Sequence, residues 1–530
     1  MMSSFPQGSL RFLLGLLLAP LSVGVTQEPF DLIIRGGRVL DGSGNPWVLT
    51  DLGVRGDRIA ALGDLSKAPA RRVIDARGLY VAPGFIDVHS HAAEGLATPA
   101  LSGAQPILAQ GITTLFVNPD GGGPLDLAAQ RTGFRHGLGV NVALLVGHNS
   151  VRRAVLGMAD RAPTPAELER MRQLVRAGME AGAFGLSSGP FSAPGAYSQT
   201  AELVELAKVA GQFGGAYSSH IRDEADYTIG VVAAVDEVIQ IAREARLRGV
   251  VTHIKALGPH VWGYSMALVQ RIERARAEGV EVFADQYPYT ASATGLVSIL
   301  VPRWAEVGGR DSMIRRMADP AARTRLRRDM LENLDRRGGA DRIQFRRYPP
   351  DPAIEGKTLA DVARGRQLDA VDTAIELIKA GEPAIVSFNM SEADVAFLMR
   401  QPWVMTCTDG DLVPMGEGVP HPRTYGAFPR KLRKYVVEDA VLDLATAIRS
   451  MTSLPATVFR VKDRGILREG AFADLVVFDL NRVRDVGTFQ QPHQLAEGME
   501  YVVVNGQVAI DQGRFNASKS GRVLSLPGGN

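Results

Sequence analysis

The stretch APGFIDVHSH, residues 82–91, combines a short apolar run with two histidines at its end. The run 85–88 has the length of a short buried strand. His89 and His91 follow it two residues apart, and side chains at this spacing on a strand point to the same side. Both imidazoles can therefore reach one metal ion. An H-x-H pair alone is weak evidence for a metal site, so the prediction depends on whether the rest of the chain supplies further ligands.

Beyond this stretch, apolar runs of strand length alternate with helical segments such as 166–180 and 231–247. The runs occupy residues 85–88, 113–117, 141–147, 183–186, 215–219, 250–254, 280–284, 384–388 and 403–406. Alternating β and α units imply a parallel sheet, and this many units predict an α/β fold with a (β/α)8 TIM barrel over residues 83–460. Nine runs exceed eight strands, so one is surplus or belongs to an insertion. The basic, helix-like stretch 303–347 predicts such an insertion around 300–360.

Both ends of the chain are rich in short strands separated by glycines. Residues 31–63 show this pattern before the barrel, and 465–480 and 501–515 show it afterwards. Neither end has enough strands to bury a sheet by itself. We therefore expect residues 28–82 and 461–530 to form one small β-sandwich domain, with a tail at the carboxyl end.

Residues 1–27 predict a signal peptide. Arg11 precedes an apolar stretch from Phe12 to Leu21, which is too short to cross a bilayer and about the length of a signal-peptide core. The alternative is an N-terminal helix that frays. Export predicts a periplasmic or secreted protein, and no other run of the sequence is apolar enough to span a membrane.

Composition excludes several function classes. Among 530 residues, 59 Lys and Arg against 57 Asp and Glu leave a formal charge of +2, which indicates neither a nucleic-acid nor a membrane-surface partner once the signal is removed. The single cysteine, Cys407, excludes an internal disulfide and an all-cysteine metal site. We expect it to be buried rather than catalytic. A homo-oligomer is left open.

Further metal-ligating residue types lie at the ends of later strands. His220 ends GGAYSSH, His253 lies in VVTHIKA, and Asp409 closes WVMTCTDG. The carboxyl ends of barrel strands meet at one mouth, where barrel enzymes place their chemistry. Each residue has a plainer alternative, since Asp-Gly is an ordinary turn and a histidine can be a core residue. Together with His89 and His91 they predict a divalent metal site.

With these motifs the chain resembles the amidohydrolase superfamily, and within it the N-acyl-D-amino-acid deacylases (D-aminoacylases). The matching stretches extend over nearly the whole chain after the signal peptide: LIIRGGRVLDGSG (32–44), APGFIDVHSH, GITTLFVN (111–118), VGHNSVRRAVLG (146–157), GAFGLSSGPFSAPGAY (182–197), YSSHIRDE (217–224), THIKALG (252–258), ADQYPYTAS (284–292), TDG (408–410) and HPRTYGAFPR (421–430). The resemblance implies a barrel with a split β domain and Zn²⁺ held by His89, His91, His220, His253 and Asp409. It also implies hydrolysis of N-acyl-D-amino acids.

The sequence departs from the superfamily at one ligand. Many members bridge two metals with a carboxylated lysine on the fourth strand, where this chain reads FGLSSG. Known D-aminoacylases use a cysteine after the second strand, and the aligned residue here is Asp120 in VNPDGGG. We assign Asp120 as a further metal ligand, the alternative being an aspartate that only starts the glycine turn. The sequence leaves open whether one or two zinc ions are bound.

The site suggests a mechanism and a substrate clamp. A metal lowers the pKa of water and polarises a carbonyl, while Asp409, with one oxygen free, can take the proton and pass it to the leaving nitrogen. By resemblance, Lys255 and Tyr287 bind the substrate α-carboxylate, and Arg423 is a third candidate. A solvated lysine and a packed aromatic are the alternatives. Asp223 and Glu224 are expected in a solvated loop or as partners of nearby arginines.

Three functions are therefore weighed. The first is a zinc-dependent hydrolase that converts N-acyl-D-amino acids to a carboxylate and a free D-amino acid. The second is a related amidohydrolase acting on D-configured dipeptides or cyclic amides. The third is a non-catalytic scaffold of the same fold, which would be expected to lack metal ligands that this sequence retains. The preference for D over L substrates rests on the resemblance alone.

Overall fold

The computed structural model describes residues 28–527. The predicted signal peptide, residues 1–27, lies outside the described residues. Among the helices of 28–527, none combines the length and the apolar character needed to cross a bilayer.

Eight parallel strands form the barrel. They are β6 (Phe85–Asp87), β7 (Ile112–Val117), β8 (Asn141–Leu144) continued by β9 (Val146–Gly147), β10 (Gly185–Ser188), β11 (Ala216–Ser219), β12 (Gly249–Val251), β13 (Val282–Gln286) and β17 (Val404–Thr406). Nearly every residue of these strands is buried, as expected for a parallel sheet covered by helices. Eight of the nine apolar runs in the sequence therefore supply barrel strands.

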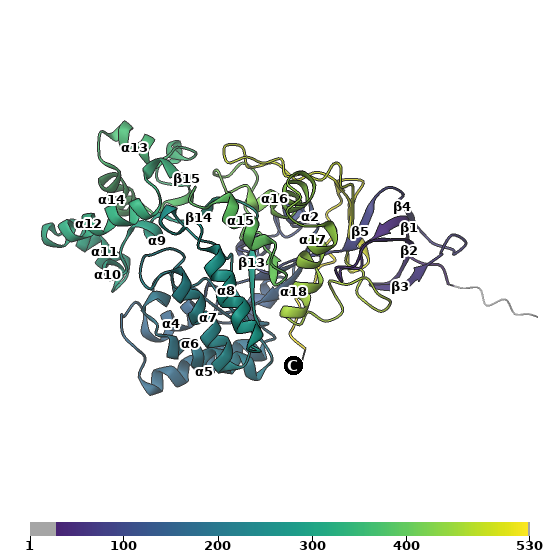
Figure 1. Cartoon of the computed structure of the whole chain (residues 1–530), viewed down its shortest axis with the longest axis horizontal. Coiled ribbons are helices and arrows are strands. Elements are labelled where there is room, and N and C mark those ends of the chain that lie inside the picture. Colours follow the sequence, from purple (N-terminus) through teal and green to yellow (C-terminus); the bar gives the residue numbers. More distant parts are fainter. Residues whose placement is uncertain (1–27, 528–530) are drawn as a thin grey trace, which may run out of the picture.

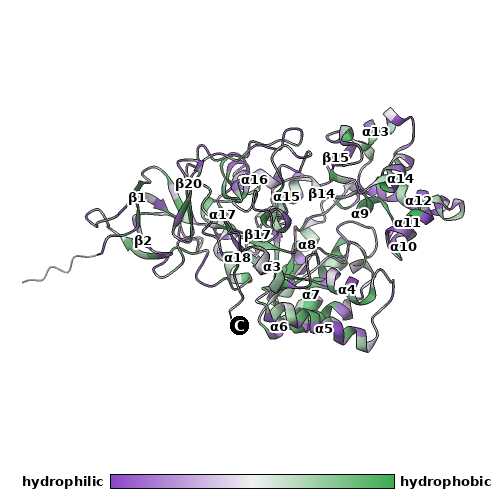
Figure 2. Ribbon diagram, turned by 180° about the vertical axis from the view of Figure 1, so that it is seen from behind, coloured by the Kyte–Doolittle hydropathy of each residue, from purple (hydrophilic) through white to green (hydrophobic). Residues whose placement is uncertain are grey.

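Helices follow the barrel strands and cover their outer side. These are α1 (Ala93–Leu96), α2 (Gln105–Leu108), α3 (Leu127–Gly133), α4 (His148–Leu156), α5 (Pro165–Glu180), α6 (Thr200–Gln212), α7 (Val231–Ala245), α8 (Ser265–Ala277), α15 (Glu392–Met399), α16 (Arg423–Arg430), α17 (Leu444–Met451) and α18 (Ser453–Val458), with a π-helical stretch from Lys431 to Glu438. Thr164 and Glu167 form a capping box that starts α5. The outward turns of α5 and α6 are hydrophilic, so the apolar faces pack inward (Figure 2).

The ninth run, 384–388, belongs to an inserted unit. Its sheet consists of β14 (Ser292–Gly295), β16 (Ala384–Ser387) and β15 (Ile343–Arg347), all antiparallel. Its helices are α9 (Leu296–Leu300), α10 (Arg303–Glu306), α11 (Arg310–Ala318), α12 (Pro320–Arg336), α13 (Leu359–Arg366) and α14 (Ala370–Ala380). This insertion, β14 to β16, has its own apolar core. It is longer at both ends than the expected 300–360, because its sheet begins before the basic helices and ends after them.

Strands from both ends of the chain form one nine-stranded sheet. They are β1 (Leu32–Val39), β2 (Val48–Arg55), β3 (Arg58–Gly63), β4 (Val73–Asp75), β5 (Tyr80–Pro83), β18 (Leu475–Phe478), β19 (Met499–Val504), β20 (Gln507–Asp511) and β21 (Arg514–Phe515). Antiparallel pairing of β5 with β18 joins the two ends. Leu475 and Val477 face a core within this domain, whereas Val476 and Phe478 pack against the barrel.

The barrel therefore lies between two smaller units. Figure 1 shows β1–β5 at one end of the molecule and the helices of the insertion at the other. The predicted fold class, a (β/α)8 barrel with a small domain built from both chain ends, is confirmed, and the strands of that domain, predicted to form a β-sandwich, are hydrogen-bonded into one sheet.

Candidate metal centre

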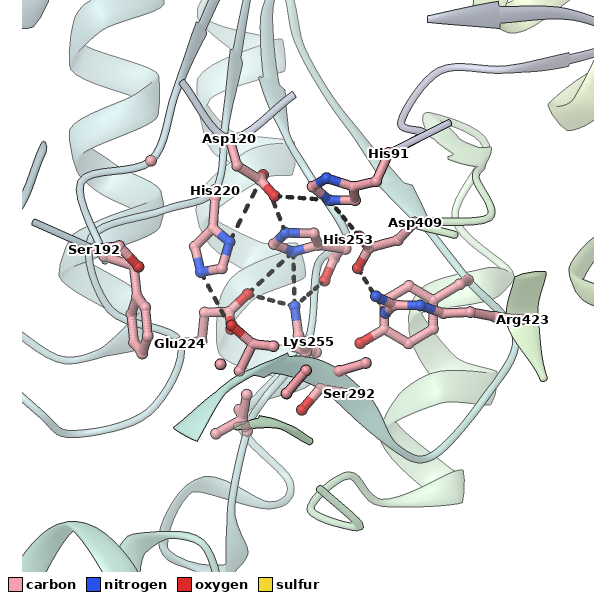
Figure 3. Close-up of a pocket in the computed structure, with 18 of the residues that line it drawn as sticks. His91, Asp120, Ser192, His220, Glu224, His253, Lys255, Ser292, Asp409 and Arg423 are labelled. Carbon is pink, nitrogen blue, oxygen red and sulfur yellow. Dashed lines mark hydrogen bonds and ion pairs between the residues drawn. The ribbon is translucent and has the colours of Figure 1, made fainter. Parts of the chain in front are cut away.

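The six side chains predicted as metal ligands come together at the carboxyl ends of the barrel strands. They form two groups, and the ligand atoms of each group lie within 4.8 Å of one another. The first group is His89, His91, Asp120 and Asp409, and the second is Asp120, His220 and His253. Asp120 belongs to both groups (Figure 3), so its carboxylate would be a ligand shared by ions held in the two groups.

Closure of the barrel between its first and last strands positions the first group. Nε2 of His89 lies 3.4 Å and Nε2 of His91 lies 3.2 Å from Oδ1 of Asp409. The amide of Asp409 donates to the carbonyl of His89 at 2.9 Å. Asp87 reinforces the contact by accepting from the Thr408 amide at 3.0 Å and the Thr408 hydroxyl at 2.5 Å. Burial raises the pKa of Asp87 to about 7.

The second group is supported from behind by an acidic side chain. Nδ1 of His220 lies 3.7 Å and Nε2 of His253 lies 3.6 Å from Oδ1 of Asp120. Glu224 lies on the other side of both rings, 3.1 Å from Nδ1 of His253 and 3.6 Å from Nε2 of His220. A carboxylate behind a metal-binding histidine fixes its tautomer and orientation. With its proton on Nδ1 toward Glu224, His253 presents the lone pair of Nε2 to the ion position.

Asp120 reaches the centre from a constrained loop after β7. Its φ is 55° and that of Asn118 is 64°, a left-handed conformation that Asp and Asn adopt more readily than most residues. Ser187 of β10 holds the loop, since its hydroxyl donates to the Asn118 carbonyl at 2.7 Å and accepts from the Gly121 amide at 3.2 Å. The strand that lacks the superfamily's lysine thus supports the loop that supplies a carboxylate.

The donor set fits zinc. Both ring nitrogens of His89, Oδ1 of Asp120 and Nε2 of His220 are buried without a hydrogen-bond partner among residues 28–527. A buried polar atom left unpaired costs about 1–3 kcal/mol. Of these atoms, Nε2 of His89 and Oδ1 of Asp120 face each other at 3.4 Å, an arrangement typical of a site for a cation, and imidazole and carboxylate are common zinc ligands. The residues can hold one ion in each group.

The charge balance of the centre also favours a cation. Burial opposes ionisation of Asp120 and Asp409, but neighbouring His89 and Arg423, respectively, keep both pKa values well below the usual range. Burial acts to lower the pKa of His91 as well, yet the two carboxylates raise it to about 9. Burial lowers the pKa of His220 to about 4. A metal ion would take the place of protons here, so its binding releases them.

Asp409 does not have the free oxygen expected from the sequence. Oδ1 faces His89 and His91, and Oδ2 forms an ion pair with Nη1 of Arg423 at 2.7 Å. The guanidinium of Arg423 in turn lies 4.7 Å from the ring centroid of Tyr287. Asp409 has a φ of 49°, and strained conformations of this kind gather at functional sites. Arg423 therefore orients the carboxylate of Asp409 through this ion pair.

Lys255 and Tyr287 line the same cavity, and two of the three donors of Lys255 already have acceptors within the chain. Lys255 is 3% exposed, and its ammonium contacts Glu224, Nδ1 of His253 at 2.7 Å and the His253 carbonyl at 2.8 Å. A lysine has three donors, and Nδ1 of His253, which carries its own proton toward Glu224, cannot accept one of them, so one donor of Lys255 is left for a substrate carboxylate. Among residues 28–527 the only hydrogen-bond partner of the Tyr287 hydroxyl is the sulfur of Met390, at 3.6 Å, so this hydroxyl is available to a ligand.

The expectation that Asp223 and Glu224 lie in a solvated loop is wrong. Asp223 is fully buried and accepts hydrogen bonds from the amides of Ala225 and Thr228, which hold the loop after β11. Glu224 is 3% exposed and supports the second ligand group. An acidic side chain four residues after a ligand histidine was the available sequence indication. His148 pairs with Glu202 at 2.8 Å, outside the metal cluster.

A cavity of about 290 Å³ opens onto the ligands, and the insertion forms part of its wall. Ser292, Gly295, Arg337, Arg346 and Ala384 come from the insertion and line the cavity. An ion pair between Arg346 and Asp411 ties β15 to the loop after β17. The insertion is thus held against the barrel at the wall of this cavity.

A buried lysine lies next to the strand that carries Asp409. Lys431 is 2% exposed and donates to Oγ1 of Thr406 in β17 at 2.9 Å and to Oγ of Ser450 in α17 at 2.8 Å. Burial lowers its pKa from the ordinary 10.5 to about 7. Cys407, beside Thr406, is fully buried, and burial raises the pKa of its thiol.

The low pKa of Lys431 predicts a pH-dependent stability. Below pH 7 both the folded and the unfolded chain carry this proton, whereas between about pH 7 and 10.5 only the unfolded chain does, so this lysine makes stability rise with pH. Lys431→Met removes the effect. We expect the Tm of the variant, relative to wild type, to be higher at pH 6 than at pH 9.5 by about 2–5 °C. Exposed Lys379, changed to Met, should show no such difference, and an equal offset at both pH values would contradict the assignment.

Comparison with known proteins agrees with this geometry. The model of the amidohydrolase family matches residues 72–510. N-acyl-D-glutamate deacylase of Alcaligenes xylosoxydans xylosoxydans is 37% identical, over 94% of this chain and 97% of the relative. D-aminoacylase of the same organism is 35% identical, over 94% and 98%.

Solved structures give the same answer. The structure of N-acyl-D-glutamate deacylase from Bordetella bronchiseptica, complexed with zinc and a phosphonate inhibitor, superposes with a TM-score of 0.81 at 36% identity, covering 94% of this chain and all of that one. A D-aminoacylase structure gives 0.80 at 32% identity with the same coverage. The resemblance seen in the sequence is thereby confirmed, and the chain belongs to the amidohydrolase family.

Proposed function

We propose that this protein is a zinc-dependent hydrolase that converts N-acyl-D-amino acids to a carboxylate and a free D-amino acid. The observation that carries the proposal is the pair of His/Asp groups sharing Asp120 at the floor of a 290 Å³ cavity. The same chemistry is supported by relatives named N-acyl-D-glutamate deacylase, N-acyl-D-aspartate deacylase and D-aminoacylase, each at least 35% identical over most of the chain.

The chain's own residues supply proton transfer and orientation. Zinc, when bound, would lower the pKa of water and polarise the acyl carbonyl. Asp409, kept ionised by Arg423 and His89, can take one proton from the attacking water on Oδ2, whose ion pair with Arg423 would open in that step. It can then give that proton to the amide nitrogen as the C–N bond breaks, releasing the amine and the carboxylate. Glu224 holds His253 in the tautomer that the ion requires.

Amides of other kinds are the second candidate. A cyclic amide or a D-configured dipeptide would use the same metal centre, and the three protein partners of Lys255 leave its role as a carboxylate clamp open to test. We also propose export through residues 1–27, supported by Arg11 and the apolar stretch that follows it. The protein would then act in the periplasm or outside the cell.

A hydrolysis screen tests this function. Periplasmic and cytoplasmic fractions, and the purified protein, are assayed with matched N-acetyl-D- and N-acetyl-L-amino acids, D-dipeptides and a hydantoin. We expect amine release from the N-acetyl-D series, in the periplasmic fraction, lost on chelation and restored by added zinc. Release from the hydantoin alone would favour the cyclic-amide alternative. No release from any substrate with zinc present would exclude the proposed function.

A further inference from the structure

The cavity beside the metal centre is lined by four long basic side chains, three of which are neutralised by the chain itself. The neutralised pairs are Lys255 with Glu224, Arg346 with Asp411, and Arg423 with Asp409. Each of the six side chains lines the cavity. Lys255, Arg346 and Arg423 therefore need no bound anion to balance their positive charges.

Arg337 is the fourth basic side chain, and it differs from the others. It follows α12 in the insertion and is 1% exposed. Among residues 28–527 no carboxylate oxygen lies within 4.0 Å of its guanidinium, the limit for an ion pair. Its partners are neutral: Nε donates to the hydroxyl of Tyr227 at 2.5 Å, and Nη1 donates to Asn389 at 2.8 Å when the amide of Asn389 is oriented with its oxygen toward the guanidinium, the orientation that satisfies its neighbours.

This arrangement fixes the guanidinium without neutralising it. Asn389 is itself held by Ser292, whose hydroxyl lies 3.2 Å from the same amide oxygen and which also lines the cavity. A buried charge without a counter-charge is destabilising unless an anion pairs with it. A guanidinium in a fixed orientation is suited to a forked pair with a carboxylate.

We propose that Arg337 binds a carboxylate of the substrate and so selects anionic N-acyl amino acids. The proposal rests on the proposed function and names a recognition residue within the same cavity. The carboxylate has two sources, the α-carboxylate common to all N-acyl amino acids or the side chain of N-acyl-aspartate and N-acyl-glutamate. Both present the same planar group, and substrates that differ by one carboxylate distinguish them.

The test compares three substrates in wild type and Arg337→Met. N-acetyl-D-glutamate has two carboxylates, N-acetyl-D-glutamine has only the α-carboxylate, and N-acetyl-D-glutaminamide has none. The readout is the ratio of kcat/KM between successive substrates, which cancels any general loss of folding or activity. Loss of a buried charged partner predicts a change of about 10²-fold in one of these ratios.

Each outcome decides the matter. A fall in the glutamate-to-glutamine ratio assigns Arg337 to the side-chain carboxylate, and a fall in the glutamine-to-glutaminamide ratio assigns it to the α-carboxylate. If both ratios are unchanged, the inference is wrong while the proposed function stands. If the wild type hydrolyses none of the three or any other N-acyl-D-amino acid, the proposed function fails and the inference falls with it.

Two further variants guard against an indirect effect. Arg337→Lys keeps the charge and should restore part of the affected ratio. Arg336→Met is the matched control, because both arginines lie 5.5 Å from the Tyr227 ring centroid. Arg336, however, pairs with Asp226 at 3.3 Å and does not line the cavity. Its substitution should leave both ratios at the wild-type value, and an equal change in both variants would overturn the assignment.

Discussion

Asp409→Asn lowers kcat/KM on an N-acetyl-D-amino acid by about 10⁴-fold, the upper end of what a general acid–base group contributes. Asparagine has the shape of aspartate and accepts the left-handed conformation at φ 49°. It cannot take a proton from water or neutralise Arg423. Steady-state kinetics, with metal content measured on the same preparation, give the result.

The control for this substitution uses an aspartate of similar conformation. Asp463 has a φ of 57° and pairs with Arg468, with its side chain 24% exposed and away from the cavity. Asp463→Asn should keep wild-type kcat/KM. If Asp409→Asn binds metal and keeps more than a tenth of the activity, another group transfers the proton.

Asp120→Asn and Asp120→Cys are expected to behave oppositely. The asparagine amide of Asp120→Asn keeps the turn at φ 55° but removes the negative charge shared by both ligand groups. We therefore expect the metal content to fall and kcat/KM to fall with it, the latter by at least about 10²-fold. The thiolate of cysteine is a good zinc ligand, so Asp120→Cys should retain metal and a larger share of the activity.

Metal analysis and kinetics at a series of zinc concentrations separate these variants. Excess zinc should restore Asp120→Asn in part, because His89, His91, His220 and His253 are unchanged. Wild-type zinc affinity in Asp120→Asn would show that Asp120 only shapes its loop, which was the alternative left open by the sequence.

The positions of five metal ligands followed from local rules. His89 and His91 lie at the end of one strand, and alternation along a strand puts them on one side. His220, His253 and Asp409 end other strands of the same barrel, and parallel strands bring their carboxyl ends to one mouth. The sequence predicted the insertion but not its first and last residues. These limits are set by the pairing of β14 with β16, which cannot be read from either segment alone.

Other features depend on contacts between segments far apart in the chain. Glu224 was expected to be solvated, but in the folded chain it is buried behind His220 and His253. Arg423 could not be matched to Asp409, nor Lys255 to Glu224, because ion pairs leave no periodic trace in a sequence.

The sequence by itself determined the barrel, its β domain and the residue types at the metal centre, because hydrophobic periodicity and strand-end positions are local properties. Only the tertiary structure decided which charges neutralise one another and that Arg337, which belongs to the insertion, has no carboxylate partner within residues 28–527. Electrostatic pairing acts through space over a few ångströms, and those distances exist only once the chain has folded.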